Sequence, residues 1–345
     1  MSTNLSPPAM STSDLQKKKH FFLKNENFFW DIVSFRYGFK HSQLRQYKTI
    51  LKWDKIVSNE SIEWSIEIVK EFKEFLFREE NIFELCCNES LPWTIEFLQR
   101  YENLWSWELL AQNTCVMCNP TIRKYYYSRL YPYFEDYLDR CSKDFNNVSA
   151  ENQKFSDEVE RDAQEFSKHK ELQFQYPKEI LNAQDTNWYW LSHNILLPWS
   201  AALIEKYIDQ WNWTALGRNE SIPWDLELLK KFEHKIDWTM DFPDAKGKTA
   251  TTGRSISYNM SIEWDSDILS TFRNRLDKFP ISMFGNGKWN IDLVIQFNNF
   301  WDMDVLYLNK AVWEKTFPEF HTEERLIPFM DYLVATRYNQ LSIHF

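Results

Sequence analysis

The sequence predicts an all-α protein, an α-solenoid-like array of long-helix and short-helix repeats with a helical insertion. Tryptophans and asparagines recur with a period of 25 residues, from Trp199 to Trp224 and from Asn194 to Asn219. Self-similarity at such a period is typical of stacked supersecondary units. The chain of 345 residues has only six glycines, which argues against Rossmann-type and β-rich folds.

Each repeat contains a predicted longer helix that begins directly after the second tryptophan. Its first residue is a Ser, Thr, Asp or Asn, whose side-chain oxygen can accept from an unpaired backbone N–H. An acidic residue usually follows two positions later, where the helix dipole favours negative charge. The apolar spacing predicts a helix of about three turns. The capping residues are Ser65, Thr94, Ser200, Asp225, Asp265 and Asn290.

A shorter helix begins at the first tryptophan of each repeat and ends at an asparagine. Asparagine tolerates the left-handed backbone conformation that often ends a helix. The expected pairs of first and last residues are Trp53 and Asn59, Trp107 and Asn113, Trp190 and Asn194, and Trp213 and Asn219.

Ten of the 17 tryptophans occupy the two repeat positions. Because a single unit cannot bury its apolar face, we expect these side chains to form the core between stacked units. The alternative is an exposed row of tryptophans that binds a ligand. Aromatic residues in phase with a repeat usually mediate packing between units, which favours the core interpretation.

The expected segments follow one another along the chain. The polar start lacks a charged region followed by an apolar stretch, so we expect a disordered lead and no secretory signal. The last segment is a capping helix, predicted over 325–336, and a polar loop is expected at 241–256. The segments are a lead at 1–15, an N-terminal cap and first repeats at 16–119, a non-repeat helical insertion at 120–185, a second array at 186–315 and the capping helix at 316–345.

The charge is unevenly distributed, because residues 1–50 carry a net charge of +5 and the rest of the chain carries −15. A strongly acidic body repels the phosphates of nucleic acids. No apolar run reaches the roughly 18 residues needed to span a bilayer. Five cysteines, an odd number, fit a reducing cytoplasm better than a disulfide framework. We therefore expect a cytoplasmic protein without a membrane partner, and the sequence leaves its oligomeric state open.

The sequence assigns no catalytic residue, no cofactor and no metal ligand. Cys86, Cys87, Cys115 and Cys118 could form a zinc site if neighbouring units stack, but cysteine is also a common buried apolar residue. Asp302 and Asp304 resemble a metal-binding pair, yet they stand where a helix begins, so capping is the preferred interpretation.

Four residues are predicted to bind a partner: Tyr125, Tyr127, Arg129 and Tyr133. They lie where the repeat phase is lost, so no packing rule of the unit requires them. Aromatic and arginine side chains are enriched at the energetic centres of protein interfaces.

These observations favour a non-enzymatic recognition or scaffold protein that uses an acidic helical-repeat surface. Its expected partner is a protein or peptide of basic character, and one form of this function is an antidote-like protein that blocks a toxin. One alternative is an enzyme or metal-binding protein with its site in the insertion or the cysteine region. Another is a nucleic-acid binder that uses the basic N-terminus around Lys17, Lys18 and Lys19 with the Arg/Tyr segment at 123–137.

The segment from Trp190 to Ser200 resembles the short Trp-rich tandem repeats of certain bacterial and giant-virus proteins. Its pattern after Trp190 is Leu-Ser-x-Asn-x-x-Leu-Pro-Trp-Ser, and residues 213–225 are similar. The resemblance covers about 50–118 and 188–305 and departs at 120–185. It implies repeat architecture and carries no activity with it.

Overall fold

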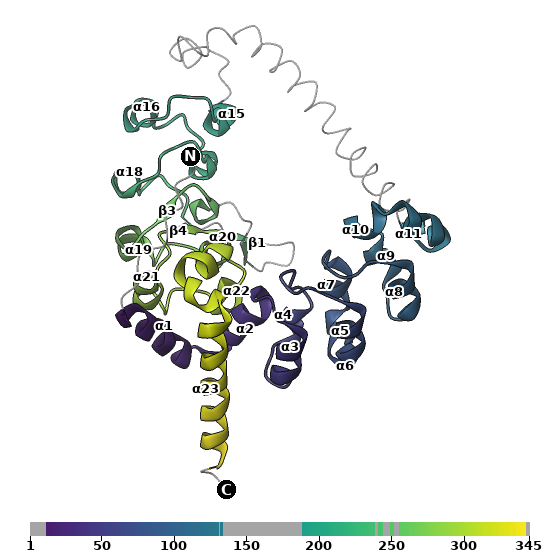
Figure 1. The fold of residues 1–345 in the computed structure, drawn as a ribbon. Helices are drawn as coiled ribbons and strands as arrows, with labels where there is room; N and C mark the ends of the chain where they lie inside the picture. The colour runs from purple at the N-terminus through teal and green to yellow at the C-terminus, as the bar shows by residue number, and fades with distance from the viewer. Residues whose placement is uncertain are drawn as a thin grey trace, which may run out of the picture. The chain divides into compact units, whose positions relative to one another are not determined.

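The computed structural model describes residues 12–130, 132–133, 188–238, 241–243, 249–251 and 255–342 (Figure 1). The described chain is mostly helical, as the predicted fold class requires. It divides into two compact units, one formed by 1–32 with 181–345 and the other by 33–180. The predicted segment 16–119 is therefore shared between the two units. Most of the predicted 120–185 insertion lies outside the described residues.

The unit of residues 33–180 begins within α2, and its described part, up to residue 133, consists of short helices. Helix α7 contacts α9, and α8 contacts α11. The helices are α2 (Glu26–Arg36), α3 (His41–Tyr47), α4 (Trp53–Ile56), α5 (Ile66–Glu71), α6 (Lys73–Leu76), η1 (Glu79–Asn81), α7 (Ile82–Cys87), α8 (Ile95–Arg100), α9 (Trp107–Leu110), α10 (Thr114–Met117) and α11 (Pro120–Tyr125).

In the other unit, α15, α17, η2, α20 and α22 contact one another in that order. Figure 1 shows α16, α18, α19 and α21 following one another along one side of this unit. Its elements are α1 (Thr12–Lys24), α15 (Trp188–His193), α16 (Ala201–Lys206), α17 (Trp213–Arg218), α18 (Leu226–Lys231), η2 (Ile256–Tyr258), α19 (Ser266–Phe272), α20 (Lys278–Phe284), α21 (Ile291–Gln296), α22 (Met303–Leu306), η3 (Val312–Thr316), η4 (Pro318–His321) and α23 (Glu323–Ser342).

The predicted helix caps are confirmed. Side-chain oxygens of all six predicted residues accept from backbone N–H groups in the first turn. Asp302 likewise caps α22 by accepting from the Asp304 N–H. The predicted length of three turns is wrong, because α5, α8, α16 and α18 have six residues each. Each of these helices ends at an aromatic residue that leaves helical geometry, such as Phe72 with φ −102° and ψ 18°.

The left-handed conformation expected at the end of the short helices is absent at two of the predicted asparagines. Asn113 (φ −76°, ψ 119°) and Asn219 (φ −73°, ψ 106°) are extended. Their side chains instead donate through Nδ2 to a backbone oxygen of the preceding unit, a contact that ends the short helix and joins it to its neighbour. We call these residues the ladder asparagines. The bonds run from Asn59 to Ser34 (2.8 Å), Asn88 to Val57 (2.8 Å), Asn113 to Cys86 (2.7 Å), Asn219 to Ser192 (3.0 Å), Asn259 to Gly217 (2.8 Å) and Asn309 to Gly285 (3.1 Å).

Most of the repeat tryptophans are buried, as expected for core residues. Trp264 is fully buried and Trp224 is 5% exposed, whereas Trp107 and Trp213 are half-buried. Trp188, rather than the predicted Trp190, begins α15. Its ring lies 5.3 Å from that of Tyr207, just as the ring of Trp213 lies 5.4 Å from that of Phe232.

Two small sheets interrupt the helices in the second half of the chain. The polar loop predicted at 241–256 contains the antiparallel strands β1 (Asp241–Pro243) and β2 (Thr249–Thr251). Strands β3 (Glu263–Trp264) and β4 (Asn286–Gly287) pair in parallel. A Cβ at Gly287 would lie 2.8 Å from the ring of Trp289, so the close approach of this ring requires glycine.

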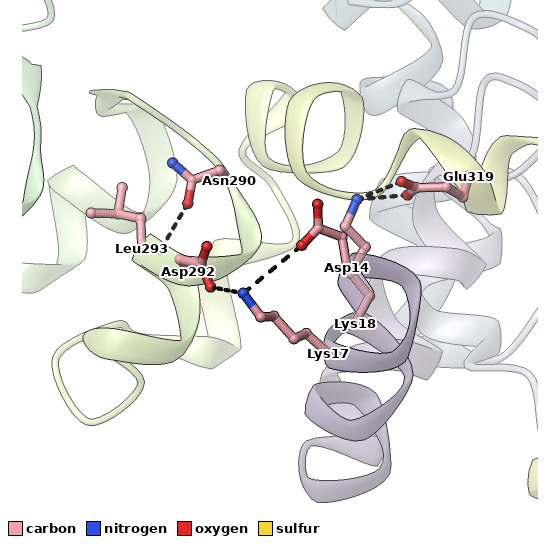
Figure 2. A network of polar contacts seen from close by, with 7 residues as sticks. All are labelled: Asp14, Lys17, Lys18, Asn290, Asp292, Leu293 and Glu319. Carbon is pink, nitrogen blue, oxygen red and sulfur yellow. Dashed lines mark hydrogen bonds and ion pairs between the residues drawn. The ribbon is translucent and has the colours of Figure 1, made fainter. Parts of the chain in front are cut away.

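Helix α1, near the start of the sequence, packs against C-terminal elements of its own compact unit. It begins at Thr12, inside the predicted disordered lead, and contacts α21. The ring of Phe22 lies 4.5 Å from that of Phe317 and 5.3 Å from that of Phe320. Figure 2 shows the polar contacts of α1, in which Lys18 Nζ lies 2.6 Å from Glu319 Oε1.

The C-terminal helix α23 is longer than the predicted 325–336 and contains Pro328. Among the residues described, no helix combines the length and the apolar character that a bilayer crossing requires.

Candidate functional site

Equivalent positions in the repeat units can be counted from the ladder asparagines. After every ladder asparagine except Asn309, a helix-capping residue follows six positions later and a buried aromatic residue thirteen positions later, as in Asn59, Ser65 and Phe72. Asn113 is followed in the same way by Asn119, which caps α11, and by Tyr126, which ends it. Residues 120–130 thus continue the pattern of the preceding units, although the sequence suggested that the phase is lost at 120. The phase is hard to see because Cys118 occupies the position of the second tryptophan.

Tyr126 anchors α11 to the preceding repeat unit. Its side chain is 3% exposed and its ring lies 4.7 Å from that of Trp107. Burial raises the pKa of Tyr126 to about 12, because the charged phenolate would lose its hydration. The buried Tyr126 hydroxyl has no hydrogen-bond partner among the described residues. Tyr126 is therefore a core residue that fixes the exposed residues beside it.

The three predicted tyrosines lie at the surface around this anchor. Tyr125 is 55% exposed, Tyr127 54% and Tyr133 40%. The Tyr125 hydroxyl accepts from Nε2 of Gln99 at 2.5 Å, and its ring packs edge-on against Tyr126 at 4.9 Å. Tyr125 is consequently held in place while more than half of its side chain faces solvent.

Arg129, the fourth predicted residue, contacts the preceding unit. Its guanidinium lies 2.8 Å from Oε1 of Glu102 and 5.2 Å from the ring centroid of Trp107. An exposed ion pair and a cation–π contact each contribute modestly to stability. Arg129 therefore has a structural role that the sequence did not indicate, and it remains exposed enough to contact a partner.

The predicted partner-binding residues left out two exposed cations of α11, Arg123 and Lys124. Among the described residues neither forms an ion pair, and Arg123 Nη1 makes one long hydrogen bond, 3.5 Å, to the Met117 oxygen. A signal was present, since no Asp or Glu occurs between Glu108 and Glu135 in a chain with 50 acidic residues. We define the α11 surface as Arg123, Lys124, Tyr125, Tyr127, Arg129 and Tyr133.

The cysteine region does not assemble a metal centre within the described parts of the chain. No group of three or more His, Cys, Asp or Glu side chains is arranged there to hold a metal ion. Cys86 is buried with Sγ 4.0 Å from the oxygen of Ser106, and burial raises its thiol pKa to about 11. Cys87, Cys115 and Cys118 are exposed.

The basic N-terminus makes contacts within its own unit. Lys17 Nζ lies 2.7 Å from Asp292 Oδ1 and 3.8 Å from Asp14 Oδ1 (Figure 2). Lys18 pairs with Glu319, and Lys19 Nζ lies 6.0 Å from the ring centroid of Phe329. Two of the three lysines offered for nucleic-acid binding are thus paired with carboxylates of the same chain.

No family of known proteins, no curated protein and no solved structure matches the chain.

Proposed function

We propose that this is a non-enzymatic recognition protein that binds a protein or peptide partner through the α11 surface. The observation that carries the proposal is the residue type at two positions, one at the end of α11 and one two residues beyond it. The residues equivalent to Tyr125 are polar or charged in the other units, namely Glu71, Arg100, Lys206, Lys231 and Thr271. Those equivalent to Tyr127 are Lys73, Glu102, Ile208, Glu233 and Arg273.

The packing of a unit therefore does not require tyrosine at either position. An exposed tyrosine ring supplies a large contact area and loses little conformational freedom on binding. Tyr125 and Tyr127 lie beside Arg129, and tyrosine and arginine are both enriched at interface hot spots. This combination supports binding in preference to a structural role.

We also propose that the units form an α-solenoid-like array that serves as the scaffold for this surface. The bonds of the ladder asparagines and the side-by-side short helices support such stacking. The resemblance to Trp-rich tandem repeats is consistent with it, and an antidote-like role is one form of the proposed recognition.

Site-specific photo-crosslinking tests the proposal. The photoreactive residue benzoylphenylalanine replaces Tyr127 in one variant and Lys73, the equivalent exposed residue, in a matched control. We expect a discrete crosslinked protein from a native lysate only with the Tyr127 variant, and excess unmodified protein should abolish it. Equal crosslinking at both positions, or none at either, would contradict recognition through this surface.

A further inference from the structure

We infer that the partner segment that binds the α11 surface is acidic, an inference that rests on the proposed function and specifies its partner. The whole chain has a net charge of −10, from which the sequence predicted a basic partner. The local charge at the α11 surface has the opposite sign. Arg123, Lys124 and Arg129 supply three cations, and the 26 residues from 109 to 134 contain no carboxylate side chain.

Local charges dominate recognition at physiological ionic strength, because the Debye length is then only about 8 Å. Among the described residues, the carboxylate that pairs with one of these cations is Glu102, whose Oε1 lies 2.8 Å from Arg129. Arg123 and Lys124 have no carboxylate partner among the described residues, so their charge is available to a ligand. A carboxylate-bearing segment would complete these ion pairs, and Tyr125 and Tyr127 would contact its apolar parts.

The placement of Arg123 supports a binding role for this charge. Arg123 stands ten residues after its ladder asparagine, Asn113. In five other units the residue at this position is an aliphatic side chain with 0% exposure, namely Val69, Leu98, Ile204, Leu229 and Leu269. In α11 the same helix position is exposed and carries a cation. The face that other units bury against their neighbours is thus open and positively charged here.

An acidic peptide fits these observations better than a single-stranded nucleic acid. The carboxylates of the peptide and the phosphates of the nucleic acid would both pair with arginine, and the bases of the nucleic acid would also stack on tyrosine. A nucleic acid carries a phosphate at every nucleotide, so the acidic body of this protein would repel the strand wherever it extended beyond the α11 surface. A short acidic segment of a protein places its charge at one point and avoids that repulsion.

Fluorescence anisotropy with the full chain tests the inference with defined probes. The probes are a fluorescein-labelled peptide rich in glutamate with two leucines, the same peptide with lysine or glutamine in place of glutamate, and oligothymidylate. We expect the glutamate peptide to bind most tightly. Arg123→Glu with Lys124→Glu should weaken it about tenfold or more, since like charges then face each other. Lys230→Glu is the matched control, because Lys230 of α18 is exposed and equivalent to Lys124.

Preferred binding of the lysine peptide, or an equal loss in the Lys230→Glu control, would overturn the inference. Tighter binding of oligothymidylate that the double variant abolishes would overturn it in favour of nucleic acid. Competition separates this inference from the proposed function. If the Tyr127 variant crosslinks a partner that the glutamate peptide cannot displace, the proposed recognition function is supported and the inference of an acidic partner segment is contradicted. If the glutamate peptide binds but Tyr127 crosslinks nothing, the proposed function fails.

Discussion

The side-chain amide of Asn88 donates to the backbone oxygen of Val57 at 2.8 Å, across 31 positions of sequence. Val57 ends the short helix α4, where carbonyl groups lack intrahelical partners. Asn88 is 3% exposed, so the bond satisfies a backbone acceptor that water reaches poorly. The same asparagine accepts from the Ser90 N–H through Oδ1 and from the Trp93 indole through its own backbone oxygen. One residue therefore fixes both the turn of its own unit and the contact with the preceding one.

Asn88→Ala should destabilise the protein by roughly 1–3 kcal/mol, because it leaves a buried carbonyl without a donor. Urea unfolding followed by circular dichroism measures the change. Asn194→Ala is the control, since Asn194 is only half-buried and its Nδ2 has no acceptor among the described residues. A loss in the control as large as that of Asn88→Ala would contradict the role assigned to the bond between units.

Trp224→Ala should cost roughly 3–5 kcal/mol, the usual range for a large aromatic side chain removed from a core. Trp224 is 5% exposed and its Nε1 donates to the Leu216 oxygen at 3.2 Å, so the substitution removes both packing and a hydrogen bond. Chemical denaturation measures the effect. A change below about 1 kcal/mol would mean that the side chain contributes little to the core, as exposed substitutions usually do.

The features that sequence predicted well are local. Capping by Ser65 or Asp225 depends only on a side chain and the next three residues, so residue type suffices to find it. The ladder bonds connect residues 24–42 positions apart, and the sequence shows the asparagines without showing what they bind. The docking of Lys18 on Glu319 spans 301 positions and has no local signal.

The candidate site shows the same division between local and distant information. Tyr125 and Tyr127 could be selected because they are aromatic and lie outside the visible repeat. Arg123 could not, since its significance depends on the register of α11, and Cys118 in place of a tryptophan conceals that register.

Lys18→Ala should be strongly destabilising, by roughly 3–5 kcal/mol, because it leaves Glu319 as a poorly solvated charge without its partner. The side chain of Lys18 is 3% exposed and that of Glu319 is 16% exposed. The double substitution Lys18→Met and Glu319→Leu should recover much of this loss, because it removes both charges. Lys17→Ala breaks the solvent-exposed pair with Asp292 and should leave the unfolding midpoint unchanged within error. Equal effects of Lys17→Ala and Lys18→Ala would contradict the importance of burial.

Because of Glu71, part of the stability of the 33–180 unit should be lost as the pH becomes acidic. The hydrogen bond from Arg45, supported by His41, lowers the pKa of Glu71 from 4.5 to about 2. A lowered pKa in the folded state means that the contribution is fully present above pH 4.5 and is lost as the pH falls towards 2. Titration of the Glu71 carboxyl by NMR measures this pKa directly. Arg45→Met should raise it towards 4.5, and a pKa that stays near 2 in this variant would exclude Arg45 as the main cause.

Replacing Tyr125, Tyr127, Arg129 and Tyr133 by alanine should weaken partner binding more than it weakens folding. The three tyrosine side chains are 40–55% exposed, so their removal creates little cavity. Arg129 differs, because its contacts with Glu102 and Trp107 also support the fold. Tyr127→Ala alone is therefore the sharper variant, since its substitution leaves the Arg129 contacts intact.

For Tyr127→Ala we expect a cooperative thermal melt close to that of the parent protein and a clear loss of the photo-crosslinked or affinity-captured partner. Tyr126→Ala provides the opposite control, because it removes a 3% exposed ring packed on Trp107 and should lower the melting temperature markedly. The two substituted residues are adjacent in sequence, yet Tyr127 is 54% exposed and Tyr126 only 3%. If Tyr127→Ala loses its cooperative melt while its soluble fraction still binds normally, the tyrosines belong to the core and the α11 surface is not the binding site.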